Sequence, residues 1–261
     1  MVYTQKIQDA IHFSIKTHEV YQKQKRKGKD IPYITHPLTV GLILSQAGAE
    51  EELVIAGILH DTIEDSIEDK KVTKEMLAER FGENVATLVD SVTEKDRGLS
   101  WHERKEAALE EIKNFSHDSL LLKSADVISN NTELISDYKR DGDKTFERFN
   151  ASKDEALQHT LQVIGVILNT WDKNSLAIDL SDIAYKLQDI GALGFMENSP
   201  ATMIEYEDYS SDMDLICPVC VWKGTPKGNT EYYDQLLDVD CPRCGKKIVI
   251  VSYPLIKKIG L

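Results

Sequence analysis

A short apolar run that carries four ligand-type side chains constrains this chain more than any other feature. Residues 57–66 read as an apolar helical segment that includes His60, Asp61, Glu64 and Asp65. At about 3.6 residues per turn, the last two follow the first two by one turn, so all four are predicted to face one pocket. A single helix cannot saturate a metal ion. Further ligands are therefore expected from elsewhere in the chain.

Two other segments offer such ligands. His36 is followed by a proline, which suits the first turn of an amphipathic helix. The imidazole of His36 is therefore expected at the N-terminal end of a helix. Residues 120–134 read as another, largely buried helix. Within it, Lys123, Asp126 and Asn130 recur at three- and four-residue spacing and share one face. Because such polar groups are costly inside an apolar run unless they are paired or ligated, this face is predicted to point into a site.

The order of these residues resembles a known pattern. His36, then His60-Asp61, then Asp126 resembles the H…HD…D pattern of HD-domain metal phosphohydrolases. Further motifs make the chain similar to the hydrolase domain of RelA/SpoT-type proteins, including its single-domain small hydrolases. These motifs are residues 26–28 before 32–37, residues 59–65, residues 81–85 with 88–89 and 92–93, and residues 123–126 with Asn130. The similarity covers roughly residues 5–150, a typical domain length.

This resemblance implies an enzyme of the stringent response that uses manganese to remove the 3′-pyrophosphate from guanosine tetra- or pentaphosphate. The ligands would be His36, His60, Asp61 and Asp126. Two imidazoles with two carboxylates suit manganese, iron or zinc better than calcium or magnesium. A bound water then becomes a usable nucleophile near neutral pH. Glu64 and Asp65 are spaced to reach that water or the leaving group, so one of them is predicted to be the general acid or base.

Substrate contacts are expected from a basic turn and one amide. By the resemblance, Lys25, Arg26 and Lys27 contact the substrate, where cations neutralise diphosphate oxygens and the arginine plane can lie over a purine. The alternative is an exposed, solvated loop, because residues 22–29 hold five cations and no anion. Asn130 is expected to orient a ligand or a substrate hydroxyl, with capping of buried backbone groups as the alternative.

The cysteines predict a second, structural metal site. They form two C-x-x-C hooks separated by twenty residues, namely Cys217, Cys220, Cys241 and Cys244. This spacing is typical of one tetrahedral zinc ion, and residues 216–261 are too short to bury a sufficient core without it. Disulfides are disfavoured because the first residues lack an apolar signal core, which predicts a cytoplasmic chain. A redox pair is disfavoured because neither hook has a thioredoxin-like strand–helix context.

The expected fold class is mainly α, an HD-domain helical bundle, with a small C-terminal β zinc ribbon. The expected domains are the phosphohydrolase domain over residues 1–195 (core 5–150 plus closing helices near 151–171 and 176–190), an acidic linker over 196–215, and a zinc-ribbon-like module over 216–261. A length of 261 residues leaves no room for a RelA/SpoT synthetase domain beside these parts. No apolar run of about 20 residues appears, so no membrane contact is expected.

Charge and one departure from the family pattern leave alternatives open. The net charge of −13 does not favour nucleic-acid binding, so a protein partner for the ribbon is as well supported as a nucleic acid. Family members usually carry an arginine near Thr132. Its absence motivates a second hypothesis, an HD phosphohydrolase for another nucleotide. A third is a nucleotide-sensing regulator that does not hydrolyse and whose ribbon contacts a partner.

Overall fold

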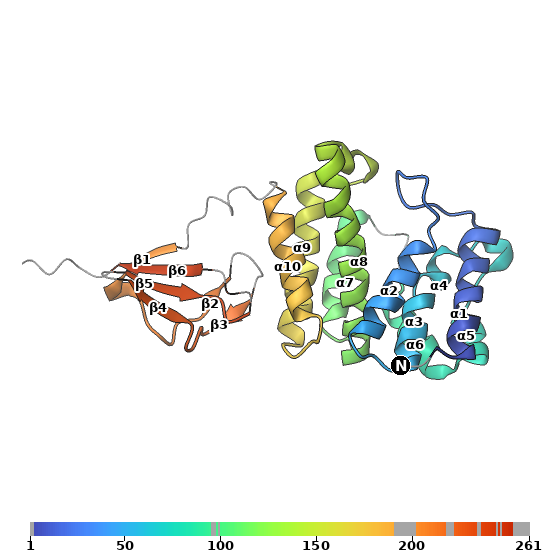
Figure 1. Ribbon diagram of the computed structural model, residues 1–261, viewed down its shortest axis with the longest axis horizontal. Coiled ribbons are helices and arrows are strands. Elements are labelled where there is room, and N and C mark those ends of the chain that lie inside the picture. Colours follow the sequence, from blue (N-terminus) through green and yellow to red (C-terminus); the bar gives the residue numbers. More distant parts are fainter. Residues whose placement is uncertain are drawn as a thin grey trace, which may run out of the picture.

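The structure, a computed structural model, consists of a large helical body with a small β-sheet beside it (Figure 1). It describes residues 3–94, 98, 100–190, 202–217, 222–233, 236–243, 245 and 247–252. The expectation of a mainly helical fold is confirmed, and a small C-terminal sheet is present. None of the helices in these ranges combines the length and the apolar character needed to cross a membrane.

The helices follow one another along the chain in two groups, before and after residue 100. Before residue 100 they are α1 (Gln5–Ile15), the π-helix η1 (Lys16–Tyr21), α2 (Thr35–Gln46), α3 (Glu51–Leu59), α4 (Thr62–Asp65), the 3-10 helix η2 (Glu68–Lys70), α5 (Lys74–Phe81) and α6 (Glu83–Val92). After it they are α7 (Trp101–Ile112), α8 (His117–Asp141), the 3-10 helix η3 (Gly142–Arg148), α9 (Lys153–Thr170) and α10 (Ala177–Asp189). Several begin at a hydroxyl that accepts a backbone N–H three residues later, namely Thr4, Thr73, Ser100, Ser116 and Ser152.

Helices α2 and α3 form a tight antiparallel hairpin, and glycine makes their close approach feasible. A Cβ atom on Gly57 would lie 2.5 Å from Leu44 Cδ1, and one on Gly41 would lie 2.6 Å from Ile58 Cγ1. Both distances are below normal contact, so a larger residue at either glycine forces a neighbour to move. The hairpin places the start of α2 beside the end of α3.

The sequence pattern suggested one continuous helix over residues 57–66, but the structure shows two helices separated by a break. Helix α3 ends at Leu59, and α4 begins only at Thr62. His60 and Asp61 occupy the break between them. Because the chain turns there, side chains on the two sides of the break need not share one face.

Two hydrophobic cores meet along α8, which Figure 1 shows between α2 on one side and α9 on the other. Leu121, Leu122 and Ala125 of α8 pack into the core built by the first six α-helices. Leu120 and Leu134 pack into the core shared with α9 and α10. Polar residues of α8 therefore lie along the boundary between the two halves of the helical body.

The C-terminal strands form a four-stranded sheet and a separate two-stranded pair. The strands are β1 (Thr202–Glu205), β2 (Leu215–Ile216), β3 (Lys223–Gly224), β4 (Thr230–Tyr233), β5 (Leu236–Asp240) and β6 (Lys247–Ser252). The larger sheet has the order β1-β6-β5-β4, with β1 parallel to β6 and the other pairs antiparallel, and β2 pairs with β3. Its core contains Val239, Val249 and Val251.

The acidic stretch expected as a linker over 196–215 contributes to this sheet. Residues 202–205 form β1 and pair with β6 over its last four residues, Val249 to Ser252. The segment Thr-Met-Ile-Glu contains β-branched residues that favour a strand, so the sheet begins earlier in the chain than the cysteine pattern indicated. Residues 191–201 lie outside the described ranges.

A polar contact between described residues joins the sheet module to the helices. Arg243 Nη2 donates a 2.6 Å hydrogen bond to the carbonyl oxygen of Leu168, in the last turn of α9. The last carbonyls of a helix lack intrahelical partners and carry partial negative charge, so a guanidinium suits this position.

Candidate active site

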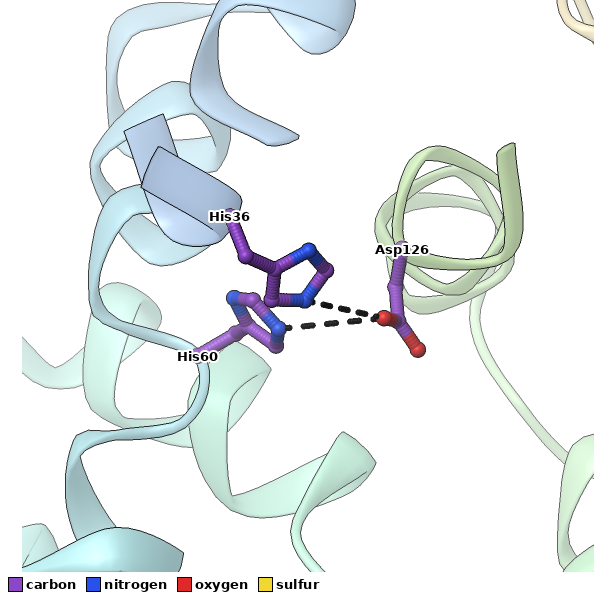
Figure 2. Close-up of side chains that lie close together, drawn as sticks. All are labelled: His36, His60 and Asp126. Carbon is purple, nitrogen blue, oxygen red and sulfur yellow. Dashed lines mark ion pairs between the residues drawn. The ribbon is translucent and has the colours of Figure 1, made fainter. Parts of the chain in front are cut away.

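Three side chains from three parts of the helical body converge at one point. His36 comes from the first turn of α2, His60 follows α3, and Asp126 comes from the middle of α8 (Figure 2). The Nε2 atoms of His36 and His60 lie 3.3 and 3.9 Å from Asp126 Oδ1. One ligand atom from each residue falls within 4.8 Å of the other two. The group is compact enough to bind one metal ion.

The outer nitrogen of each imidazole is held by a hydrogen bond. His60 Nδ1 lies 2.8 Å from the carbonyl oxygen of Gly57, which can only accept, so Nδ1 carries the proton. His36 Nδ1 lies 2.9 Å from Ser129 Oγ. With Nδ1 protonated, each ring presents the lone pair of Nε2 to the centre. This is the arrangement that metal-ligating histidines usually have.

Asp61 adds a fourth group beside the three. Its Oδ2 lies 3.0 Å from His60 Nε2 and 3.6 Å from His36 Nε2. The Tyr33 hydroxyl donates a 2.5 Å hydrogen bond to the same oxygen. Burial and the Asp61 carboxylate raise the pKa of Tyr33, so its hydroxyl stays protonated and remains a donor.

These donor atoms fit a divalent metal ion. In the described part of the chain, the buried His60 Nε2 makes no hydrogen bond of normal geometry, although a carboxylate oxygen of Asp61 lies 3.0 Å away. If His60 Nε2 and Asp61 Oδ2 both carry lone pairs, they need a proton or another cation between or beside them at this distance. A proton can serve: burial opposes it, but Asp61 and Asp126 raise the pKa of His60 to about 9. A metal ion with mixed nitrogen and oxygen ligands can serve equally.

Asp126 is held by two neighbours on its own helix. Lys123 Nζ donates to Asp126 Oδ2 at 2.8 Å, and Asn130 Nδ2 donates to Oδ1 at 2.7 Å. Although burial favours the neutral acid, Lys123 and the two imidazoles hold the pKa of Asp126 well below its usual range. The carboxylate is thus ionised and fixed in orientation. Lys123 and Asn130 can both reach Asp126 because the three residues lie on one face of α8.

The structure separates the two candidates for general acid or base. Glu64 lines the cavity that contains the histidines, and its Oε2 accepts a 3.3 Å hydrogen bond from the backbone N–H of Glu94. Burial and the nearby Asp61 raise the pKa of Glu64. Asp65, which follows the break in the helix, accepts a 2.8 Å hydrogen bond from Gln24 instead and is not among the residues that line the cavity.

The residues of the basic turn differ in their surroundings. Arg26 donates from Nη2 to Asn130 Oδ1 at 2.8 Å and from Nε to Glu133 at 2.7 Å. Its guanidinium also lies 5.4 Å from the centre of the Tyr33 ring. Its side chain is 12% exposed, so this residue is not part of a solvated loop.

The two lysines that flank Arg26 are less constrained. Lys25 forms an exposed ion pair with Asp30. Lys27 Nζ lies 5.4 Å from the centre of the Phe149 ring. Both lysines still line the cavity, so all three cations of the turn face the space where a ligand can enter.

A cavity of about 710 Å³ opens beside the converging ligands and includes residues that the sequence pattern did not indicate. Arg104 and Lys105 of α7 and His159 of α9 line it. No ligand-type residue stands at a useful spacing from His159 in the sequence. Burial, together with Lys105 and Lys123, lowers the pKa of His159 to about 4, so it is neutral near pH 7. No signal in sequence spacing relates α7 and α9 to residues so far upstream.

Thr132 does not line this cavity. It lies with Ser129 and Ser136 beside a second hollow of about 910 Å³ on another face of α8. His36 borders both spaces, since its two ring nitrogens point to opposite sides. The departure from the family pattern at Thr132 thus leaves the cations of the first cavity unchanged.

The described cysteines lie in the sheet module. Cys217 and Cys241 are buried in its core. Cys220 and Cys244, the other two residues of the expected zinc site, lie outside the described residues.

Comparison with known proteins relates the helical body to one family. A family model described as HD domain matches residues 10–154, more than half of the chain. A guanosine-3′,5′-bis(diphosphate) 3′-pyrophosphohydrolase of Aquifex aeolicus is 44% identical over 91 residues, which are 35% of this chain and 12% of that protein. The pyrophosphohydrolase MESH1 of Xenopus tropicalis is 34% identical over 130 residues, which are 49% of this chain and 69% of that protein.

Two solved structures share the fold. One is described as a metazoan orthologue of SpoT that hydrolyses ppGpp; it has a TM-score of 0.58 and 24% identity, and the match covers 74% of this chain and 99% of that one. The other is a protein of Listeria monocytogenes with a TM-score of 0.53 and 29% identity, covering 59% of this chain and 97% of that one. This chain spans only a small part of the long bacterial relative but most of these short proteins.

Proposed function

This chain belongs to the HD domain family, and from that premise we propose that it is a metal-dependent pyrophosphohydrolase. The reaction is hydrolysis of the 3′-pyrophosphate of guanosine tetra- or pentaphosphate, which yields GDP or GTP and pyrophosphate. The relatives from Aquifex aeolicus and Xenopus tropicalis carry this activity in their names.

One observation carries the proposal: the ligand atoms of His36, His60 and Asp126 converge in a cavity that cations also line. These cations are Lys25, Arg26, Lys27, Arg104, Lys105, Lys123 and Arg148. A molecule with two diphosphate groups needs such a surface, because each group brings several negative charges into a partly buried space. These cations gather at the cavity although the chain as a whole is acidic, with a net charge of −13.

His36, His60, Asp61 and Asp126 would hold the ion, and manganese suits their mixed nitrogen and oxygen donors. A divalent cation bound there supplies charge neutralisation for the scissile diphosphate and a water that is reactive near neutral pH. Tyr33 keeps Asp61 in place through its hydrogen bond.

The other residues bind the substrate and move protons. Arg26, in contact with Asn130 and the Tyr33 ring, presents a planar cation for a phosphate or a purine face. Lys27 faces the same cavity from beside Phe149. Glu64 is the proposed general acid or base, because it lines the cavity and because burial and the nearby Asp61 raise its pKa.

The alternatives of another nucleotide and of a non-hydrolysing sensor are less well supported. Thr132 motivated the hypothesis of another nucleotide. It borders the second hollow, so its identity does not change which cations line the cavity. A sensor has no need of Glu64 with a raised pKa beside a set of metal ligands.

For the C-terminal module we infer one structural zinc ion held by Cys217, Cys220, Cys241 and Cys244. The spacing of the hooks and the burial of Cys217 and Cys241 support it. Zinc thiolates persist in a reducing compartment, and guanosine nucleotides are substrates there, so we propose a cytoplasmic enzyme. We propose that the surface of this module binds a partner protein or a nucleic acid.

The test measures the release of phosphate and pyrophosphate from a nucleotide panel that includes guanosine 3′,5′-bis(diphosphate), with manganese added and with it chelated. We expect manganese-dependent pyrophosphate release from this alarmone. Asp126→Ala should abolish it, while Asp118→Ala, which removes an exposed carboxylate of the same helix, should not. Release from a different nucleotide would favour the second hypothesis. Tight binding of the alarmone without release would favour the sensor.

A further inference from the structure

Helix α8 supplies more than one group to the metal site. Asp126 points into the cavity, and Ser129, three residues later, contacts His36 from behind. The distance from Ser129 Oγ to His36 Nδ1 is 2.9 Å, and both residues are buried, at 7% and 3% exposure. One helix therefore holds a ligand and also contacts the ring of a second ligand.

The two imidazoles are oriented by different means. His60 Nδ1 is bound to the Gly57 carbonyl, a backbone group that a side-chain substitution leaves in place. His36 Nδ1 is bound to a hydroxyl, which can both donate and accept. Only the second interaction depends on the identity of a side chain.

We propose that Ser129 is a positioning residue that accepts a hydrogen bond from His36 Nδ1 and thereby directs the lone pair of Nε2 at the metal ion. The inference rests on the metal site of the proposed function. The geometry supports it, because a neutral ring whose Nδ1 donates to the Ser129 hydroxyl, 2.9 Å away, leaves Nε2 unprotonated, 3.3 Å from Asp126 Oδ1. An unpaired Nδ1–H would cost desolvation energy and favour other ring orientations.

The hollow behind α8 limits the size of the effect. Ser129 lines this space of about 910 Å³ together with Thr132 and Ser136. Water can reach the ring nitrogen from there if the hydroxyl is removed, so substitution should weaken the site without destroying it. Partners of metal-bound histidines typically change metal affinity about 10- to 100-fold.

The experiment compares manganese affinity of the full chain, by electron paramagnetic resonance titration, in four proteins. Ser129→Ala should weaken binding about 10- to 100-fold. Ser129→Thr keeps a hydroxyl and should restore affinity to within a few-fold of wild type. The matched control is Ser136→Ala, which removes an exposed hydroxyl two turns along α8 at the same hollow and should change nothing.

A second readout does not depend on folding of the alanine variant. Ring ¹⁵N shifts of wild-type protein loaded with zinc should show His36 protonated at Nδ1 and ligating through Nε2. A third readout uses the folded variants: the absorption spectrum of the cobalt form should change in Ser129→Ala and not in Ser136→Ala.

Several outcomes would overturn the inference. These are equal manganese affinity in Ser129→Ala and wild type, loss of affinity in Ser129→Ala that Ser129→Thr fails to restore, or a His36 that ligates through Nδ1. A wild-type protein that binds no manganese would overturn this inference and the proposed function together. One that binds manganese but leaves the alarmone intact would overturn only the proposed function.

Discussion

Replacing Glu64 with glutamine tests the proposed acid–base role directly. The glutamine side chain has nearly the same shape, and its amide oxygen can still accept the hydrogen bond from the Glu94 N–H, so the local structure should persist. The Glu64→Gln variant loses the ability to exchange a proton and the negative charge of the ionised carboxylate. Positioned acid–base groups typically contribute about 10²–10⁴ in rate, which corresponds to about 2.7–5.4 kcal/mol of transition-state stabilisation.

We therefore expect kcat to fall about 10²- to 10⁴-fold with manganese affinity within a few-fold of wild type. Asp65→Asn is the matched control, because this neighbouring carboxylate is bound by Gln24 and does not line the cavity. It should keep kcat within a few-fold of wild type. The assay is steady-state pyrophosphate release with saturating manganese.

The pH profile gives a second, independent readout. Burial and Asp61 raise the pKa of Glu64 above its ordinary value. If Glu64 acts as the base, the wild-type rate falls as pH drops through that raised pKa, and this limb disappears in the Glu64→Gln variant. If it acts as the acid, the rate falls as pH rises through the same pKa. A Glu64→Gln enzyme with an undiminished kcat, or an Asp65→Asn enzyme with the larger loss, would refute the reasoning.

Three further predictions concern stability. Tyr33→Phe removes the hydrogen bond to Asp61 and should lower the unfolding free energy, measured in urea, by about 1.5–3 kcal/mol. Tyr21→Phe is the control and should not lower it, because the Tyr21 hydroxyl makes no hydrogen bond among the described residues. Gly57→Ala should cost about 1–3 kcal/mol by crowding the α2–α3 hairpin; an unchanged urea midpoint would contradict this. Cys241→Ser should abolish zinc binding, measured by metal analysis, and unfold the sheet module while the helical circular dichroism persists.

Local pattern was sufficient for much of the helical body. Helices were expected over residues 151–171 and 176–190, and α9 and α10 lie there. The Ser-x-x-Glu pattern that begins at Ser100 forms a capping box at the start of α7. A small β module was expected over residues 216–261, and strand β6 lies there. In each case the signal is a short-range one, a periodicity or a cap that involves residues within a few positions of each other.

The same kind of signal misjudged the run over residues 57–66. Helical spacing put Glu64 and Asp65 in one pocket, but the break at His60 and Asp61 turned the second of them toward Gln24. The acidic stretch before the cysteines contains a strand that local pattern did not indicate. Its strand β1 pairs in parallel with β6, more than forty residues later, so no local pattern identifies the partner.

The sequence by itself determined which residues can hold a metal ion, because ligand chemistry belongs to side chains and the H…HD…D order persists whatever the fold. Only the tertiary structure decided how they are used. It closed the α2–α3 hairpin on Gly57, placed Ser129 behind His36, and brought α7 and α9 to the cavity with Lys105 and His159. These relations join segments far apart in the chain, and they arise from packing, which spacing along a sequence does not encode.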